Sequence, residues 1–152
     1  MAQRTPNLAG NLALALSSLV RGLTYPSESD EPFEPFWADM GTEEPFTPET
    51  FRKAAGIGPR YEIRFDPAQE TFQRLIDMWT DAIAGAAGAR ESNEYADYVA
   101  IFTMLATLMD AAMTDLTMVR VGGEHVVHAR VFLVGRVPDG RLAGLRSVSI
   151  ET

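Results

Sequence analysis

The residues able to do acid–base, nucleophilic or metal chemistry form no recognisable catalytic set. The chain has two histidines and no cysteine, which excludes disulfides and thiolate chemistry. His125 and His128 lie three residues apart in a segment that alternates like a strand, so they should point to opposite faces and cannot share a metal. No serine stands in a nucleophile elbow or a glycine-rich phosphate loop. The sequence therefore predicts a protein that is not an enzyme and has no cofactor of its own.

Carboxylates are instead concentrated in one segment. The net charge is −8, from 21 acidic and 13 basic residues. Residues 22–51 hold eight acids and no lysine or arginine, so this segment carries the whole net charge: Glu28, Asp30, Glu31, Glu34, Asp39, Glu43, Glu44 and Glu49. The sign is opposite to that needed to bind nucleic acid directly. It suits a basic protein partner, although a solvated, solubilising segment is the commoner meaning of such a run.

Helices are predicted on both sides of this acidic segment. Residues 8–22 have apolar side chains at helical spacing, which favours an amphipathic helix of the mature protein over a signal peptide. Five prolines exclude a long helix within the acidic segment itself, and a short strand is expected at residues 33–38. Thr47 and Pro48 then have the residue types of a helix cap and first turn, and this short helix should end before Gly56.

The middle of the chain predicts one strand followed by two helices. Residues 61–65 form the strand, and Asp66-Pro67 should begin the first helix, with Gln69 completing a capping box. A small, flexible loop is expected at residues 85–90. The second helix should run from about Glu94 to Met113, with a stripe of Met and aromatic residues facing the core.

The last third of the chain changes to the two-residue period of strands. Residues 116–121, 126–135 and 142–150 alternate, and the turns between them are Gly122-Gly123 and Pro138-Asp139-Gly140. Three successive strands with short turns predict an antiparallel meander. With helices before it, the chain is an α+β protein, and its length suits a single domain over residues 1–152. No apolar run reaches the ~20 residues of a membrane span, and a cytoplasmic location is expected.

Two distant segments resemble the nuclease A inhibitor-like family. The first is the run Leu23 to Glu34, which contains Ser27-Glu28-Ser29-Asp30-Glu31-Pro32-Phe33-Glu34. The second consists of Val119 to Gly122, Val131 to Gly135, Leu142 to Leu145 and the final Ser149-Ile150-Glu151-Thr152. They occur in the family's order, with a Thr/Pro helix start near Thr47 between them, and the resemblance extends over nearly the whole chain.

This resemblance implies an α-β-α sandwich with an antiparallel sheet that binds a non-specific DNA/RNA endonuclease and blocks its catalytic cleft. That nuclease holds a magnesium ion in a basic groove, and the residues matching Glu28 and Thr152 reach toward the metal. Magnesium takes hard oxygen ligands, which a carboxylate or hydroxyl supplies. The expected contact residues are Ser27, Glu28, Ser29, Asp30, Glu31, Glu34, Trp37, Glu151 and Thr152.

Two points remain open at the level of sequence. Residues 75–93 look longer than the family pattern and suggest an extra helix, which would alter the partner surface if it lies beside the contact edge. The acidic segment also fits an acidic protein-binding module with the same fold and a different basic partner. An enzyme would need a polar pocket that the sequence does not indicate.

Overall fold

The computed structural model describes residues 7–27, 30–123 and 126–150, and these form four helices and seven strands. The helices are α1 (Leu8–Leu19), α2 (Pro48–Ala55), α3 (Ala68–Ala84) and α4 (Ala89–Ala112). The strands are β1 (Thr24–Tyr25), β2 (Glu31–Pro32), β3 (Glu34–Ala38), β4 (Glu62–Pro67), β5 (Thr114–Gly122), β6 (His128–Arg136) and β7 (Leu142–Ile150).

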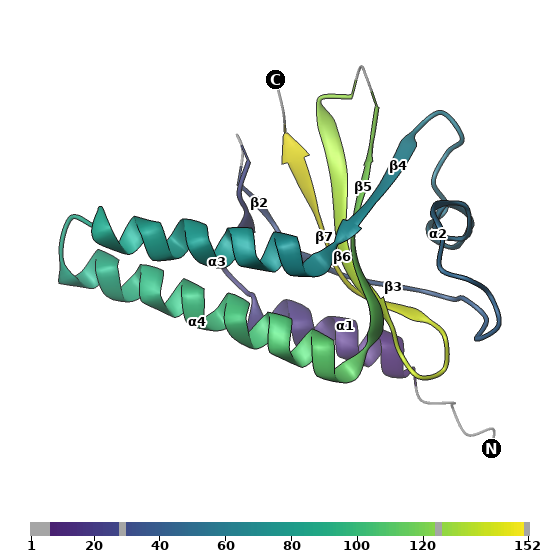
Figure 1. Cartoon of the computed structure of the whole chain (residues 1–152), viewed down its shortest axis with the longest axis horizontal. Helices are drawn as coiled ribbons and strands as arrows, with labels where there is room; N and C mark the ends of the chain where they lie inside the picture. The colour runs from purple at the N-terminus through teal and green to yellow at the C-terminus, as the bar shows by residue number, and fades with distance from the viewer. Residues whose placement is uncertain (1–6, 28–29, 124–125, 151–152) are drawn as a thin grey trace.

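A five-stranded antiparallel sheet lies at the centre of the fold. Its strand order is β3-β7-β6-β5-β4, and β1 pairs with β2 in a separate hairpin. Helices α1, α3 and α4 lie on one face of the sheet, and α2 lies on the other (Figure 1). The predicted α-β-α sandwich and the C-terminal meander β5-β6-β7 are therefore confirmed.

The alternation of side chains along the strands builds a separate core on each face. Met118, Leu133 and Leu145 lie opposite one another in register and pack under α1, α3 and α4. Val119 and Phe132 point the other way and pack under α2. Since β6 and β7 lie between these two cores, most of their residues are buried and apolar side chains occur on both of their faces.

Two glycines make the meander possible. A Cβ at Gly144 in β7 would lie 1.9 Å from the carbonyl oxygen of Leu133, so no larger residue fits between these strands. Gly140 has a φ of +94° in the turn between β6 and β7 and donates its N–H to the carbonyl of Val137. The prediction that Pro138-Asp139-Gly140 forms this turn is confirmed.

Helix α2 follows the predicted cap residues closely. The hydroxyl of Thr47 accepts from the N–H of Thr50, the hydroxyl of Thr50 accepts from the N–H of Thr47, and Pro48 is the first helical residue. Gly56 ends the helix in the left-handed conformation, with a φ of +69°. The buried ring of Phe51 fixes the helix against the sheet.

Two predicted helix starts are wrong. Asp66 and Pro67 continue β4 and pair with Met118 and Thr117, so α3 begins at Ala68 without a side-chain cap. The Asp66 carboxylate accepts from Arg64 instead, which removes it from the capping role. Helix α4 begins at Ala89 rather than near Glu94, and the Glu91 carboxylate in its first turn accepts from the N–H of Ala87 just before the helix.

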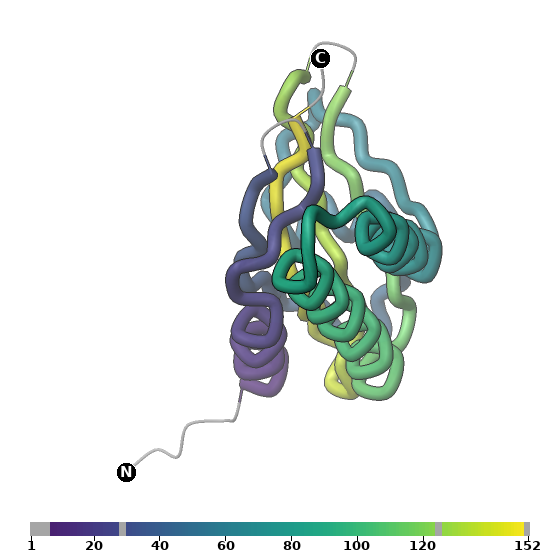
Figure 2. Tube along the Cα trace, turned by 90° about the vertical axis from the view of Figure 1, so that its left-hand side faces the viewer, coloured from purple at the N-terminus to yellow at the C-terminus, as the bar shows by residue number. Residues whose placement is uncertain are grey.

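Helices α3 and α4 pack side by side and form a long pair whose free end extends beyond the edge of the sheet (Figure 1). Figure 2 shows this pair from its free end, with α1 beside α4 in the same layer. The free end carries a cluster of Trp79, Tyr95 and Tyr98, whose ring centroids lie 4.8 to 6.3 Å apart. Glu94 beside the Tyr98 hydroxyl raises the pKa of that phenol to about 12.

Candidate functional site: the loop between β1 and β2

The loop between β1 and β2, residues 26–30, is called the acidic loop. The two strands that it connects form a hairpin that is fixed to the core. Tyr25 of β1 is buried, and its hydroxyl accepts a hydrogen bond of 2.8 Å from Arg74 of α3. Phe33, just after β2, packs edge-on against Tyr25 and also against Phe102 of α4. The two ends of the loop are therefore held by aromatic side chains, which lowers the entropy cost of presenting it to a partner.

Two serines join this loop to the end of β7. The buried Ser147 hydroxyl is within 3.0 Å of the Glu31 carbonyl oxygen and 2.9 Å of the Pro32 carbonyl oxygen, so its one proton is shared between two carbonyl groups of β2. Ser27 accepts a hydrogen bond of 3.2 Å from the N–H of Ile150. These contacts connect positions more than 110 residues apart in the sequence.

Asp30 gives the loop a tight bend. It has a φ of +44°, in the left-handed region that aspartate tolerates better than most residues. Its carboxylate accepts from the N–H of Ser27 at 3.4 Å, which is a long and weak hydrogen bond. The exposed Asp30 carboxylate therefore stays open to a partner.

The predicted contact residues are brought together only in part. Ser27, Asp30 and Glu31 lie at the base of the loop, next to the end of β7. The predicted positions Glu28, Ser29, Glu151 and Thr152 lie outside the described residues. Ser27 and Ile150 are the residues that immediately precede Glu28 and Glu151 in the sequence.

Glu34 and Trp37 do not join this group. Glu34 lies on the sheet face that carries α2, where its carboxylate pairs with Arg146 at 3.2 Å. Trp37 is 43% exposed and points to the opposite face of the edge strand β3. It is paired with Ala143, seven residues before Ile150, which is about 23 Å along the strand. Trp37 therefore belongs to a different part of the surface.

The acidic segment as a whole is also spread along the molecule. The Glu44 carbonyl accepts from Arg136, whose strand partner is Leu142 at the start of β7. Ile150 lies eight residues further on, so the end of β7 near which Glu44 is held is about 26 Å along the strand from the loop end. Asp39 is paired with Arg141 at 3.0 Å. The described acids of this segment therefore do not form one patch, contrary to the simplest interpretation of the sequence.

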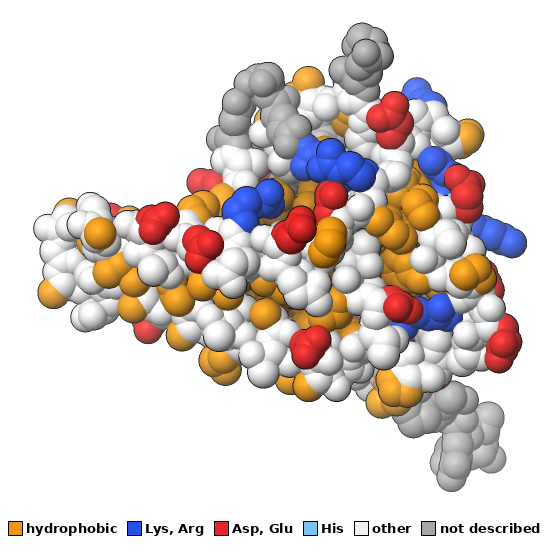
Figure 3. Space-filling model, viewed as in Figure 1, with side chains coloured by type: hydrophobic (Ala, Val, Ile, Leu, Met, Phe, Trp, Pro, Cys, Tyr) orange, Lys and Arg blue, Asp and Glu red, His pale blue; other side chains and the backbone are white. Residues whose placement is uncertain are grey.

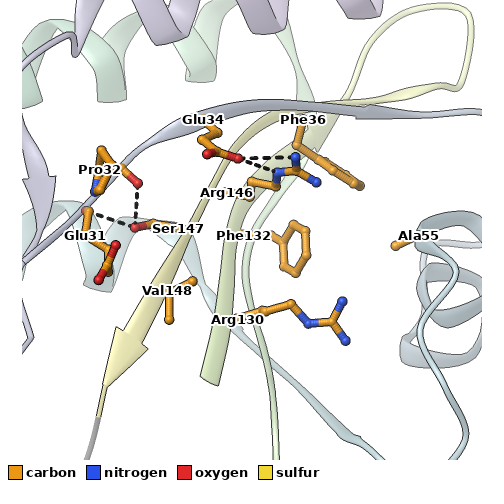
Figure 4. Close-up of a pocket in the computed structure, with 10 residues that line it drawn as sticks. All are labelled: Glu31, Pro32, Glu34, Phe36, Ala55, Arg130, Phe132, Arg146, Ser147 and Val148. Atoms are coloured by element: carbon orange, nitrogen blue, oxygen red, sulfur yellow. Dashed lines mark hydrogen bonds and ion pairs between the residues drawn. The ribbon is translucent and has the colours of Figure 1, made fainter. Parts of the chain in front are cut away.

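A hollow on the α2 face of the sheet was not predicted. It has a volume of about 290 Å³ and lies between the end of α2, β6, β7 and the base of the acidic loop (Figure 4). Its floor is formed by Phe36 and Phe132, and Arg130 and Arg146 reach into it. The sequence held one signal of this site: Arg130 and Arg146 each lie between residues of the alternating strand segments that supply the core.

The segment of residues 75–93 forms the free end of α3, the turn after it and the first turn of α4. It begins beside Arg74, which contacts Tyr25, so α3 runs away from the base of the acidic loop. In Figure 3 the charged side chains toward the free end of this pair are acidic, whereas Lys and Arg side chains gather over the sheet and α2. Because Arg74 of α3 contacts Tyr25 next to the acidic loop, a partner that binds the loop must also fit against the start of α3.

In the ranges 7–27, 30–123 and 126–150, no helix is both long and apolar enough to cross a membrane. The same part of the chain holds no group of three or more His, Asp or Glu side chains that could hold a metal ion. His128 is exposed at the start of β6, and His125 lies outside the described residues.

Comparison with known proteins identifies the family. No curated protein sequence matches the chain. A family model described as nuclease A inhibitor-like protein matches residues 10–152, from the first helix to the last residue of the sequence. The match includes α1, the loop between β1 and β2, the helical pair and all strands of the meander. The chain therefore belongs to the nuclease A inhibitor-like family.

Proposed function

We propose that this protein is a stoichiometric inhibitor that binds a sugar-non-specific endonuclease and blocks its catalytic cleft. The contact is made by the loop between β1 and β2 together with the residues that follow β7. The observation that carries the proposal is the pair of serine contacts, Ser27 with Ile150 and Ser147 with Glu31 and Pro32. They hold the acidic loop and the end of β7 side by side in a member of an inhibitor family.

The chemistry of the contact follows from the oxygen atoms available at this edge. Glu28 supplies a carboxylate and Thr152 a hydroxyl, and both are hard ligands suited to the surroundings of a magnesium ion. We propose that this magnesium belongs to the nuclease and that the inhibitor carries no cofactor. The acidic loop then takes the place of the nucleic acid's negative charge in the basic groove.

The same proposal assigns the protein no catalytic activity, no direct contact with nucleic acid and a cytoplasmic location. A net charge of −8 opposes binding to phosphates, and the absence of cysteine fits a reducing compartment. An inhibitor that protects a cell's own nucleic acid must act where that nucleic acid lies.

The test is inhibition of a magnesium-dependent, sugar-non-specific endonuclease by wild type and three variants. Glu28→Ala and deletion of Glu151-Thr152 should each weaken inhibition at least about tenfold, which is 1.4 kcal/mol. The matched control Glu43→Ala removes an exposed acid at the other end of the acidic segment and should change the inhibition constant less than about twofold.

Circular dichroism of each variant supplies the folding control. Equal inhibition by wild type and both site variants would show that the contact lies elsewhere. Failure of the wild type to inhibit any such nuclease would favour an acidic protein-binding module with another basic partner.

Calorimetry distinguishes a magnesium ion that is bound by the nuclease from one that is bound by the inhibitor itself. Titration of the free protein with magnesium should show no binding at micromolar concentration, because the proposed oxygen ligands belong to separate segments and form no closed cage. Micromolar binding by the free protein would assign the metal to the inhibitor and contradict this part of the proposal.

A further inference from the structure

The hollow on the α2 face lies beside the proposed contact edge. Glu31 and Pro32, at the base of the acidic loop, line it on one side, and Ala55 of α2 lines it on the other. Val148, two residues before Ile150, forms part of its wall. Any protein that covers the loop and the end of β7 from this face also covers the hollow.

The two arginines of the hollow differ in their partners. The Arg146 guanidinium pairs with the Glu34 carboxylate at 3.2 Å. Arg130 lies 5.3 Å from the centre of the Tyr61 ring and has no carboxylate within 4.0 Å among the described residues. In Figure 4 the Arg130 side chain lies beside Phe132 and points toward Ala55. A half-buried guanidinium over an apolar floor is suited to a carboxylate, which it can bind through two parallel hydrogen bonds.

The rim of the hollow limits which anion can enter. The carboxylates of Glu31 and Glu34 stand at its edge. The two glutamates and two arginines of the lining balance in charge, which does not suit a polyanion such as a nucleic-acid backbone, whereas a single carboxylate on an apolar stem can place its charge on Arg130. The stem can pack against Phe132 and Val148, which supply the apolar part of the lining.

We infer that this hollow receives an acidic side chain of the bound nuclease, with Arg130 as the specificity-determining residue of the inhibitor. This inference rests on the proposed function, because it takes the nuclease as the occupant. In the resulting interface, acids of the inhibitor's loop face the basic groove of the nuclease, and Arg130 of the inhibitor binds an acid of the nuclease. Such an arrangement selects one nuclease among several with similar basic grooves.

The first test compares Arg130→Gln with Arg64→Gln in the full-length protein. Arg64 is exposed, forms an ion pair with Asp66 and lies on the opposite face of the sheet. Both variants remove one positive charge, so long-range attraction to a basic nuclease should rise equally in both. We expect Arg130→Gln alone to dissociate about tenfold faster from an inhibited nuclease. Equal dissociation of the two variants would overturn the inference.

The second test needs no nuclease. NMR spectra of the labelled protein are recorded with N-acetyl-glutamate amide and, as the uncharged control, with N-acetyl-glutamine amide. The glutamate compound alone should shift the signals of Arg130, Phe132 and Val148, and this response should vanish in Arg130→Gln but persist in Arg64→Gln. No shift, or equal shifts with both compounds, would overturn the inference. If wild type inhibits no nuclease, the proposed function fails, while this titration still decides whether the hollow binds a carboxylate.

Discussion

The hydroxyl groups of Ser27 and Ser147 hold the acidic loop against β7. Leu145, Ser147 and Ser149 share one face of β7, which is the face buried under the helices and the β1–β2 hairpin. Serines at such positions break the apolar pattern, and this break was visible in the sequence. Its meaning was not, because the hydroxyl partners at Glu31 and Pro32 lie more than 110 residues away. Only the folded structure shows that the β1–β2 hairpin packs against β7 at these serines.

Ser147→Ala should therefore destabilise the fold slightly and weaken inhibition. The buried hydroxyl bridges two carbonyl oxygens, and its loss should lower the free energy of unfolding by about 1 kcal/mol. Urea unfolding measures this as a lower midpoint at unchanged slope. Ser17→Ala is the control, since the half-buried Ser17 hydroxyl bonds only to its own helix at Leu14. Its midpoint should stay within the error of wild type, and an equal effect of both variants would deny Ser147 any special role.

At the scale of elements, predictions from sequence were right where local chemistry determines the structure. Thr47, Pro48 and Gly56 are sufficient to define α2, and Pro138-Asp139-Gly140 defines the turn between β6 and β7. The prediction for Asp66-Pro67 was wrong because pairing of β4 with β5 outweighs the helix-starting preference of these residues. The hollow could not be predicted, because it is formed by β6, β7, α2 and the acidic loop, which meet only through the sheet order.

Thr47→Ala tests whether the α2 cap stabilises the protein. The variant removes one partner of the reciprocal bonds between Thr47 and Thr50, and unfolding should become easier by about 1 kcal/mol. Thr103→Ala makes the same replacement inside α4, where the hydroxyl bonds back to Val99 and alanine is the better helix former. It should leave stability unchanged or raise it by up to about 0.5 kcal/mol. Thermal unfolding of both proteins gives the comparison, and a loss in Thr103→Ala equal to that in Thr47→Ala would argue against the cap.

At the scale of the whole molecule, charge is divided among three regions. Residues 68–112, the helical pair, carry seven acids and two arginines, so they are acidic like the segment of residues 22–51. The basic side chains lie instead on and around the strands. Near Tyr61, a hydrogen bond from Arg60 and the charge of Arg60 lower the pKa of the phenol, and the charge of Arg130 adds to this effect. Outside residues 22–51 the sequence has equal numbers of acids and bases. Counting them did not show that the helical pair is acidic and the strands are basic.

The division of charge predicts how salt affects association. The screening length falls from about 30 Å at 0.01 M salt to about 10 Å at 0.1 M. Distant acids should therefore help encounter with the nuclease at low salt, and only those of the loop at physiological salt. Stopped-flow association rates should fall as salt rises, and Asp30→Asn should slow association more than Glu44→Gln at 0.1 M salt. Rates that do not respond to salt would leave the acidic segment with a solubilising role only.

Titration of nuclease activity with this protein tests most directly whether it is a stoichiometric inhibitor. A magnesium-dependent, sugar-non-specific endonuclease is held at fixed concentration with saturating magnesium, and cleavage of DNA and of RNA is followed as the protein is added. Both activities should fall linearly and reach zero near one equivalent, because one inhibitor covers one cleft. Unchanged cleavage of both substrates at a large molar excess of the protein would contradict this prediction.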